Sequence, residues 1–204
     1  MRTRMSALTL ERSPEPGLGL GPALSWRARL AALLCALALL SPAAARADFT
    51  NNNDLIAAIE DNDEAGVRLA VVTINPNSRH EDGTPAVVLA AEARNPAIVE
   101  ILLKAGARPD ASAKDGRTAL SLAAQYGLAR IARLLIDAGA DVEKPGTNRE
   151  PPLIKAVRER QIEVASILLA AGADPEASDS TGLAARDIAG RQNDPRLIAL
   201  FEVQ

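Results

Sequence analysis

The sequence has few of the side chains from which enzymes build active sites. Its 204 residues include one histidine and one cysteine. His80 stands beside Glu81 and Asp82, but no second histidine or nearby cysteine is present to complete a metal site. Serine nucleophiles also lack a histidine or a well-placed lysine as base. We therefore expect no catalytic, cofactor-binding or metal-binding residues, and we interpret His80 as an exposed loop residue.

Aromatic residues are equally scarce. They make up 2% of the chain, although 48% of the residues are hydrophobic. This composition argues against one large globular core and is typical of thin helices that stack on one another. A glycine-rich phosphate loop is also missing, because the glycine-rich run at residues 17–21 precedes no strand–helix unit.

The first 47 residues have the features of a secretory signal peptide. Arg27 and Arg29 precede an uncharged apolar run at residues 30–40, and the small residues at 43–47 end in an Ala-Arg-Ala site. The apolar run is too short to span a bilayer as a helix. We expect cleavage after Ala47 and export by the general secretory route to the periplasm. A retained leader that anchors the protein to the membrane is one alternative, and secretion from the cell is another.

Cleavage after Ala47 would leave an acidic protein. The leader holds six basic and two acidic residues, so that 23 − 6 = 17 basic and 26 − 2 = 24 acidic residues remain, a formal charge of −7. Binding to phosphates requires a positive surface, so this balance argues against nucleic acid as a partner. Cleavage also removes Cys35 and with it any disulfide or thiol chemistry. We expect no membrane contact after cleavage.

After residue 50, several kinds of residue recur in one frame of 33 positions. The spacing is constant because 139 − 106 and 172 − 139 both equal 33. Glycines and apolar residues in independent columns follow this frame, which indicates an array of repeats. The columns are Gly106, Gly139 and Gly172; Gly83, Gly116 and Gly182; Ile98, Ile131, Val164 and Leu197; and Ile101, Leu134, Ile167 and Leu200.

The repeat at residues 115–143 shows the structure of one unit. Asp115-Gly116 predicts a tight turn with a positive φ at the glycine, and Thr118 follows as the cap of a short helix. Gly127 ends this helix, and a second helix runs to Gly139, which we expect to be left-handed. Neither helix is long enough to be stable alone, so each unit must pack against neighbours.

These features resemble the ankyrin repeat family, in which a turn and two helices make up a repeat of this length. The resemblance depends on Thr118-Ala119-Leu120 with Ala123, and on Ile131-x-x-Leu134-Leu135-x-x-x-Gly139-Ala140. It implies an all-α repeat solenoid of about five stacked helix–turn–helix units with short β-turn fingers. The repeat domain would occupy residues 48–204, with repeats at about 51–79, 80–112, 113–145, 146–178 and 179–204. The first and last repeats are atypical, as expected of caps.

The fourth repeat departs from the pattern at its finger. Arg149 stands where the other fingers have glycine, and Pro145-Gly146 predicts an earlier turn. In the outer helices, we expect Leu134 and Leu135 to be buried against both neighbouring repeats.

The resemblance also places binding residues on the concave face, where the fingers and inner helices are exposed. The expected protein-binding residues are Lys114, Asp115, Arg117, Gln125, Tyr126, Asn148, Glu150, Arg158 and Glu159. Tyr126, Arg117 and Arg158 are candidate anchors, because tyrosine and arginine often dominate interface energetics. The alternative is that Tyr126 packs over its own helix and the arginines are solvated. Arg133, on a second helix, should face away.

We therefore expect a monomeric, non-catalytic module of the periplasm or cell envelope that binds an unidentified protein without a cofactor. A secreted effector that binds a host protein and a membrane-tethered scaffold are the alternatives.

Overall fold

The computed structural model describes residues 51–202, so the predicted signal peptide at residues 1–47 lies outside the described part. Within residues 51–202, ten α-helices form five consecutive pairs. The first helices of the pairs are α2 (Asn52–Glu60), α4 (Ala86–Glu92), α6 (Ala119–Tyr126), α8 (Pro152–Arg158) and α10 (Ala185–Gln192). The second helices are α3 (Glu64–Thr73), α5 (Pro96–Lys104), α7 (Ala129–Asp137), α9 (Ile162–Ala170) and α11 (Pro195–Glu202).

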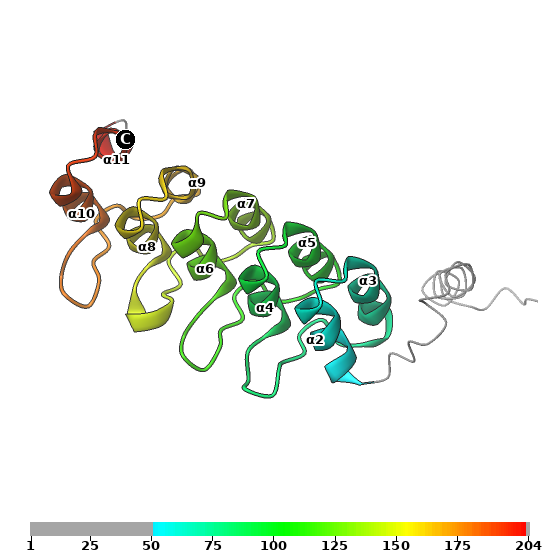
Figure 1. The fold of residues 1–204 in the computed structure, drawn as a ribbon. Coiled ribbons are helices and arrows are strands. Elements are labelled where there is room, and N and C mark those ends of the chain that lie inside the picture. Colours follow the sequence, from blue (N-terminus) through cyan, green and yellow to red (C-terminus); the bar gives the residue numbers. More distant parts are fainter. Residues whose placement is uncertain (1–50, 203–204) are drawn as a thin grey trace, which may run out of the picture. The chain divides into compact units, whose positions relative to one another are not determined.

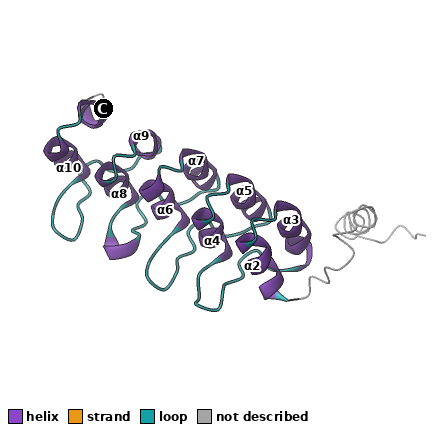
Figure 2. Ribbon diagram, viewed as in Figure 1, coloured by secondary structure: helices purple, strands orange, loops and turns teal. Residues whose placement is uncertain are grey.

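The helix pairs stack side by side in two rows (Figure 1). The first helix of each pair packs on the first helix of the next and forms the inner row, while the second helices pack on one another as the outer row. Finger loops extend from the inner row (Figure 1). Residues 51–202 contain helices and loops but no sheet (Figure 2). The expected all-α repeat solenoid is confirmed.

The helix ends follow from local chemistry. The Thr118 hydroxyl accepts a hydrogen bond from the Ser121 N–H at 3.0 Å and satisfies a free donor at the start of α6. Gly127 ends the same helix in the left-handed conformation, with φ 69°. The Asn95 side chain caps α5, and Pro96 occupies its first turn, where the missing N–H is harmless. These caps define short helices, and packing between repeats must stabilise them.

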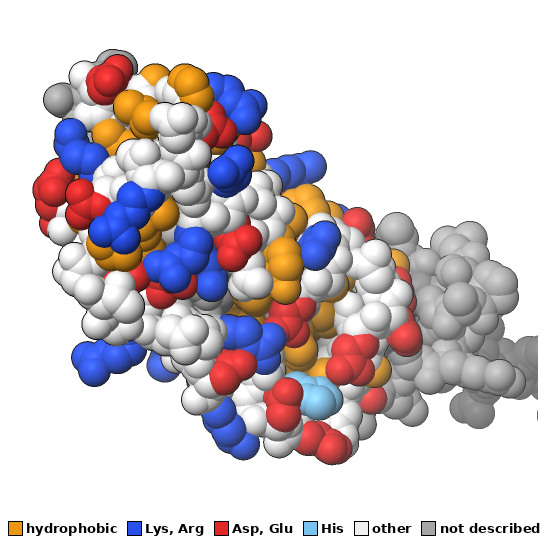
Figure 3. Space-filling model, turned by 60° about the vertical axis from the view of Figure 1, so that its left-hand side comes forward, with side chains coloured by type: hydrophobic (Ala, Val, Ile, Leu, Met, Phe, Trp, Pro, Cys, Tyr) orange, Lys and Arg blue, Asp and Glu red, His pale blue; other side chains and the backbone are white. Residues whose placement is uncertain are grey.

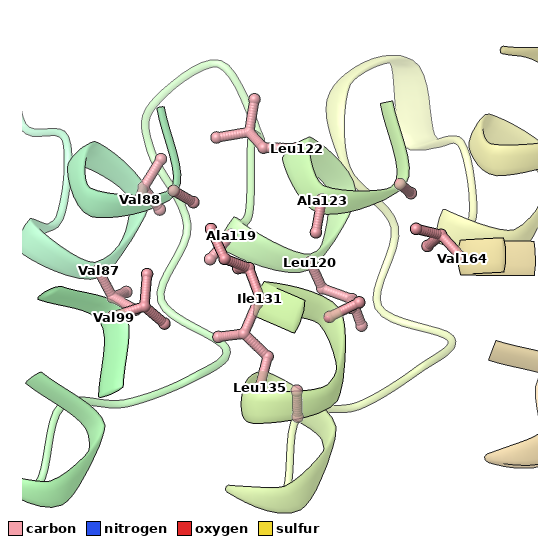
Figure 4. Close-up of a cluster of buried hydrophobic side chains, with 14 of the residues drawn as sticks. Val87, Val88, Val99, Ala119, Leu120, Leu122, Ala123, Ile131, Leu135 and Val164 are labelled. Carbon is pink, nitrogen blue, oxygen red and sulfur yellow. The ribbon is translucent and has the colours of Figure 1, made fainter. Parts of the chain in front are cut away.

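The core runs through the described stack between the inner and outer rows. Figure 4 shows one part of it. Two columns of the outer helices, each with a spacing of 33, supply many of its larger side chains. They are Ile98, Ile131, Val164 and Leu197, and Leu102, Leu135, Leu168 and Phe201, all at most 4% exposed.

The predicted burial of Leu134 is wrong, whereas that of Leu135 is confirmed. Leu135 is fully buried and Leu134 is only half-buried. Residues four apart share one face of a helix, so Ile131 and Leu135 face the inner row together. Leu134 lies beside that face, at its edge.

A residue in the left-handed conformation recurs in the turn between the two helices of each pair. These residues are Asn62, Arg94, Gly127, Arg160 and Asn193, with φ between 52° and 69°. The last four lie 33 residues apart. Glycine and asparagine adopt this conformation at low cost, but arginine does not. The turn geometry is therefore imposed by the packing of the helices and not by the local sequence.

The fourth finger keeps the register of the others, so the predicted earlier turn at Pro145-Gly146 is wrong. The Gly146 N–H donates to the Glu150 carbonyl, as the Ala113 N–H donates to the Arg117 carbonyl. The turn lies at Asn148 and Arg149, with φ 62° and 59°. Backbone pairing within the finger thus overrides the Pro-Gly signal and forces Arg149 into the left-handed conformation of a glycine.

Candidate functional site

The side of the stack formed by the finger loops and the inner helices is here called the finger face. Among the hollows of the described residues, two open on it. The first lies between the second and third repeats and the second between the fourth and fifth. The nine predicted binding residues all belong to fingers or to the ends of inner helices. The structure brings six of them together in these two hollows: Arg117, Gln125 and Tyr126 in the first, and Asn148, Glu150 and Arg158 in the second.

The first hollow has a volume of about 400 Å³ and an exposed aromatic ring at its edge. Tyr126, the last residue of α6, is 42% exposed. Its ring lies under the guanidinium of Arg94, which is 4.5 Å from the ring centroid. Leu122 and Gln125 complete the wall from the same inner helix. An open tyrosine that a cation holds in place is a suitable contact for another protein.

Arg117 joins the second and third repeats across this hollow. Its guanidinium forms ion pairs with Glu92 at the end of α4 and with Asp115 in its own finger. The Asp115 carboxylate also accepts the Arg117 N–H at 3.1 Å. Arg117 is therefore half-buried and orientated, and not the freely solvated side chain of the alternative interpretation.

The second hollow has a volume of about 440 Å³ and is more strongly charged. Asn148, Arg149 and Glu150 line it from the fourth finger, and Arg158 lines it from the end of α8. Asp179, Ser180 and Thr181 of the fifth finger form the opposite wall.

Arg158 bridges two carboxylates in this hollow. Glu150 is 5% exposed, with Lys155 Nζ at 3.1 Å from Oε2 and Arg158 Nε at 3.0 Å from Oε1. Oε1 accepts no hydrogen bond from the described residues, so the second contact is an ion pair. Arg158 also donates to Asp179 Oδ2 at 2.7 Å. Arg158 thus ties the fourth repeat to the fifth and neutralises a buried carboxylate, a role that neither sequence interpretation included.

Asp179 is held by its own finger as well as by Arg158. The Thr181 hydroxyl donates to Asp179 Oδ1 at 2.6 Å, and the N–H groups of Thr181 and Leu183 donate to the same oxygen. These hydrogen bonds, with that of Thr181 foremost, lower the pKa of Asp179 to about 2. Asp179 is therefore ionised over the physiological range.

The other three predicted residues lie outside the hollow of their own repeat. Asp115 contributes through Arg117, as described. Lys114 lies against Gly83 of the preceding finger, where a β-carbon would be 2.6 Å from Lys114 Cε. Glu159 is exposed at the end of α8. Arg133 lies on the outer helix α7 and pairs with Glu163 of α9 at 2.9 Å, so it belongs to the outer row as expected.

His80 is half-buried, and its imidazole lies between two acidic side chains. Nδ1 is 3.1 Å from Asp82, and Nε2 is 3.6 Å from Glu60. The Thr84 N–H, which donates to Asp82 at 2.7 Å, is the main reason why the pKa of Asp82 falls to about 2. Among residues 51–202, no group of three histidine, cysteine or acidic side chains is placed to hold a metal ion.

The predicted binding residues did not include Arg94, Arg149 or Asp179. Two of them had a signal in the repeat frame, because 127 − 94 and 182 − 149 both equal 33 and the later residue is glycine in each case. An arginine where other repeats have glycine indicates a side chain that is kept despite the cost of a left-handed backbone conformation. Asp179 had no such signal.

Comparison with known proteins identifies the repeat. A family model described as ankyrin repeats (3 copies) matches residues 55–145 and 106–179. No curated protein matches the chain significantly. None of the helices in the described part of the chain has the length and apolar character needed to cross a membrane.

Proposed function

The chain belongs to the ankyrin repeat family, because the two matches together span residues 55–179 of 204. We propose that it is a non-catalytic module of the periplasm or cell envelope that binds a protein through the finger face. Ankyrin repeats are protein–protein interaction modules. The fold alone does not specify a partner, so the proposal depends on the residues of this chain.

The first hollow is the observation that carries the proposal. Tyr126 and Val72 are the only large hydrophobic side chains of residues 51–202 that are strongly exposed, and Tyr126 alone lies on an inner helix. Exposed tyrosine is enriched among the residues that dominate binding energy. Its partner Arg94 and the Glu92–Arg117 ion pair fix the surrounding surface, which lowers the entropy lost on binding.

Site-specific photocrosslinking tests the binding face. A photoreactive phenylalanine analogue at position 126 should form an adduct with a protein in the periplasm, whereas the same analogue at position 133, on α7, should not. Once the adduct is identified, Tyr126→Ala should weaken binding by about 2 kcal/mol or more, roughly thirtyfold. An adduct at position 133 and none at 126 would place the binding face on the outer helices.

The location is proposed from the sequence of the leader. A basic segment, an apolar run and an Ala-Arg-Ala site support export and cleavage. The intact mass of the protein recovered from the periplasm should correspond to a chain that begins at Asp48. Recovery of a chain that still contains residues 30–40 would favour the membrane-tethered scaffold instead.

A further inference from the structure

Positive charge on the finger face is concentrated in the fourth repeat. Its finger and inner helix, residues 144–160, hold five basic and two acidic residues, a net charge of +3. The matching segments are less basic: residues 78–94 carry −1, residues 111–127 carry +1 and residues 177–193 are neutral. Basic side chains gather over the C-terminal repeats, whereas acidic ones surround the histidine (Figure 3). A partner that covers the fourth repeat should therefore be acidic there.

Within the finger of this repeat, Arg149 has an unusual backbone conformation. It has φ 59° at the turn position where Gly83, Gly116 and Gly182 have φ 93°, 86° and 79°. Side chains with a β-carbon disfavour this conformation, so arginine is retained there at an energetic cost. Glycine would fit the finger better. An arginine retained in a finger where the other repeats have glycine points to a use for its guanidinium.

Arg149 is also the arginine of the hollow that remains available to a ligand. Arg158 and Lys155 are neutralised by Glu150, and Arg158 by Asp179 as well. Arg149 is exposed and takes part in none of the ion pairs or side-chain hydrogen bonds described for residues 51–202. Asn148 and Ser180 stand beside it in the wall with further hydrogen-bond donors. A guanidinium can bind a carboxylate through two parallel N–H groups.

We propose that the hollow between the fourth and fifth fingers is the docking site for a carboxylate side chain in an acidic segment of the protein partner, with Arg149 as its anchor. Arg158 shapes the site and, held by Glu150 and Asp179, keeps the two fingers at a fixed spacing. This proposal rests on the proposed function, since it specifies which chemistry the finger face recognises.

The full chain is expressed and the resulting protein is titrated with a synthetic ten-residue peptide of alternating glutamate and glycine. Binding is followed by NMR. The peptide should shift the amide signals of residues 147–150 and 179–181. The same peptide with glutamine in place of glutamate should not. Loss of one ion pair should weaken binding about fivefold in Arg149→Gly, and Arg149→Lys should restore part of it. Arg149→Gly should also melt about 2–8 °C higher, because glycine relieves the backbone.

Arg160→Gly is the matched control. Arg160 belongs to the same repeat, carries the same charge and has a similar φ of 56°, but it lies outside the hollow. This variant should also melt at a higher temperature, yet bind the glutamate peptide as the wild type does. If both variants weaken binding equally, the effect is due to net charge and the docking site is wrong.

Other outcomes distinguish this proposal from the proposed function. Amide shifts elsewhere, equal binding of the glutamine peptide, or unchanged binding by Arg149→Gly would each overturn the docking site while leaving a crosslink at position 126 intact. Inorganic phosphate that shifts the same amides with higher affinity than the glutamate peptide would overturn the carboxylate assignment. Binding of the peptide in the hollow with no protein crosslinked at position 126 would support the docking site and contradict the proposed contact at Tyr126.

Discussion

Leu135→Ala should be among the most damaging substitutions in the repeat array. Leu135 has no exposed surface and belongs to α7 of the central repeat, which packs between α5 and α9. Leu102 and Leu168 hold the same position in those two helices. Removal of a buried leucine side chain costs the transfer free energy and leaves a cavity, together about 3–4 kcal/mol. For an array of this size, that loss corresponds to a fall in Tm of roughly 6–16 °C.

Leu134→Ala is the matched control, because it removes the same atoms from the next residue of the same helix. Leu134 is half-buried, so that water can fill the space, and the cost should be about 1 kcal/mol. Urea unfolding followed by circular dichroism at 222 nm measures both values. Equal losses for the two variants, or a larger loss for Leu134→Ala, would show that the orientation of α7 is wrong. Because repeats contact only their neighbours, Leu135→Ala should also broaden the transition by uncoupling the two ends.

Three further predictions concern single contacts. Arg158→Ala should lower the free energy of unfolding by about 1–3 kcal/mol, because the buried Glu150 would keep only Lys155 as a partner. An unchanged free energy in the same urea assay would contradict the bridging role of Arg158. Asp179→Asn should reduce stability at pH 7. The difference in stability from the wild type should shrink as the pH falls from about 4 towards 2. The reason is that the pKa of Asp179 lies at about 2 in the folded state, and stabilisation by a carboxylate with a lowered pKa is lost on protonation. A difference in Tm that stays constant with pH would contradict this role of the Asp179 carboxylate. Gly127→Ala should lower the free energy of unfolding by about 1–2 kcal/mol, because φ is 69° there and the new β-carbon would lie 2.2 Å from Gln161 Oε1. An unchanged Tm would mean that this turn relaxes freely.

The repeat architecture could be predicted from the sequence because burial recurs with the same period as the chain. Ile131 is apolar for the same reason as Ile98 and Val164, since all three face the inner row. The column of Leu134 has the same spacing and apolar character but lies at the edge of the core. Periodicity therefore located the helices correctly but did not determine which of two adjacent leucines is enclosed. That depends on the rotation of α7 between its neighbours.

The site could be predicted only as a set of positions. The family resemblance predicted Arg117, Tyr126 and Arg158 on the finger face. In the structure, Arg117 and Tyr126 line the first hollow and Arg158 lines the second. The ion pairs of these arginines join residues 25 and 21 positions apart, Arg117 with Glu92 and Arg158 with Asp179. No local pattern specifies such pairs. Whether an arginine is an open contact or a bridge between repeats follows only from the stacking.

The distribution of left-handed arginines links stability to the proposed docking site. Arg94, Arg149 and Arg160 occupy positions where other repeats have glycine or asparagine, and each costs about 1–2 kcal/mol relative to a residue suited to the conformation. Two of the three belong to the fourth repeat, which also encloses the carboxylate of Glu150. Repeats in a stacked array gain stability from their neighbours, so one strained repeat is tolerated when the repeats on both sides are well packed. Here Ile131 of the third repeat and Leu197 of the fifth repeat are buried. The fourth repeat can thus keep Arg149 at a backbone position that disfavours it, which is the pattern expected where binding and not folding selects the residue.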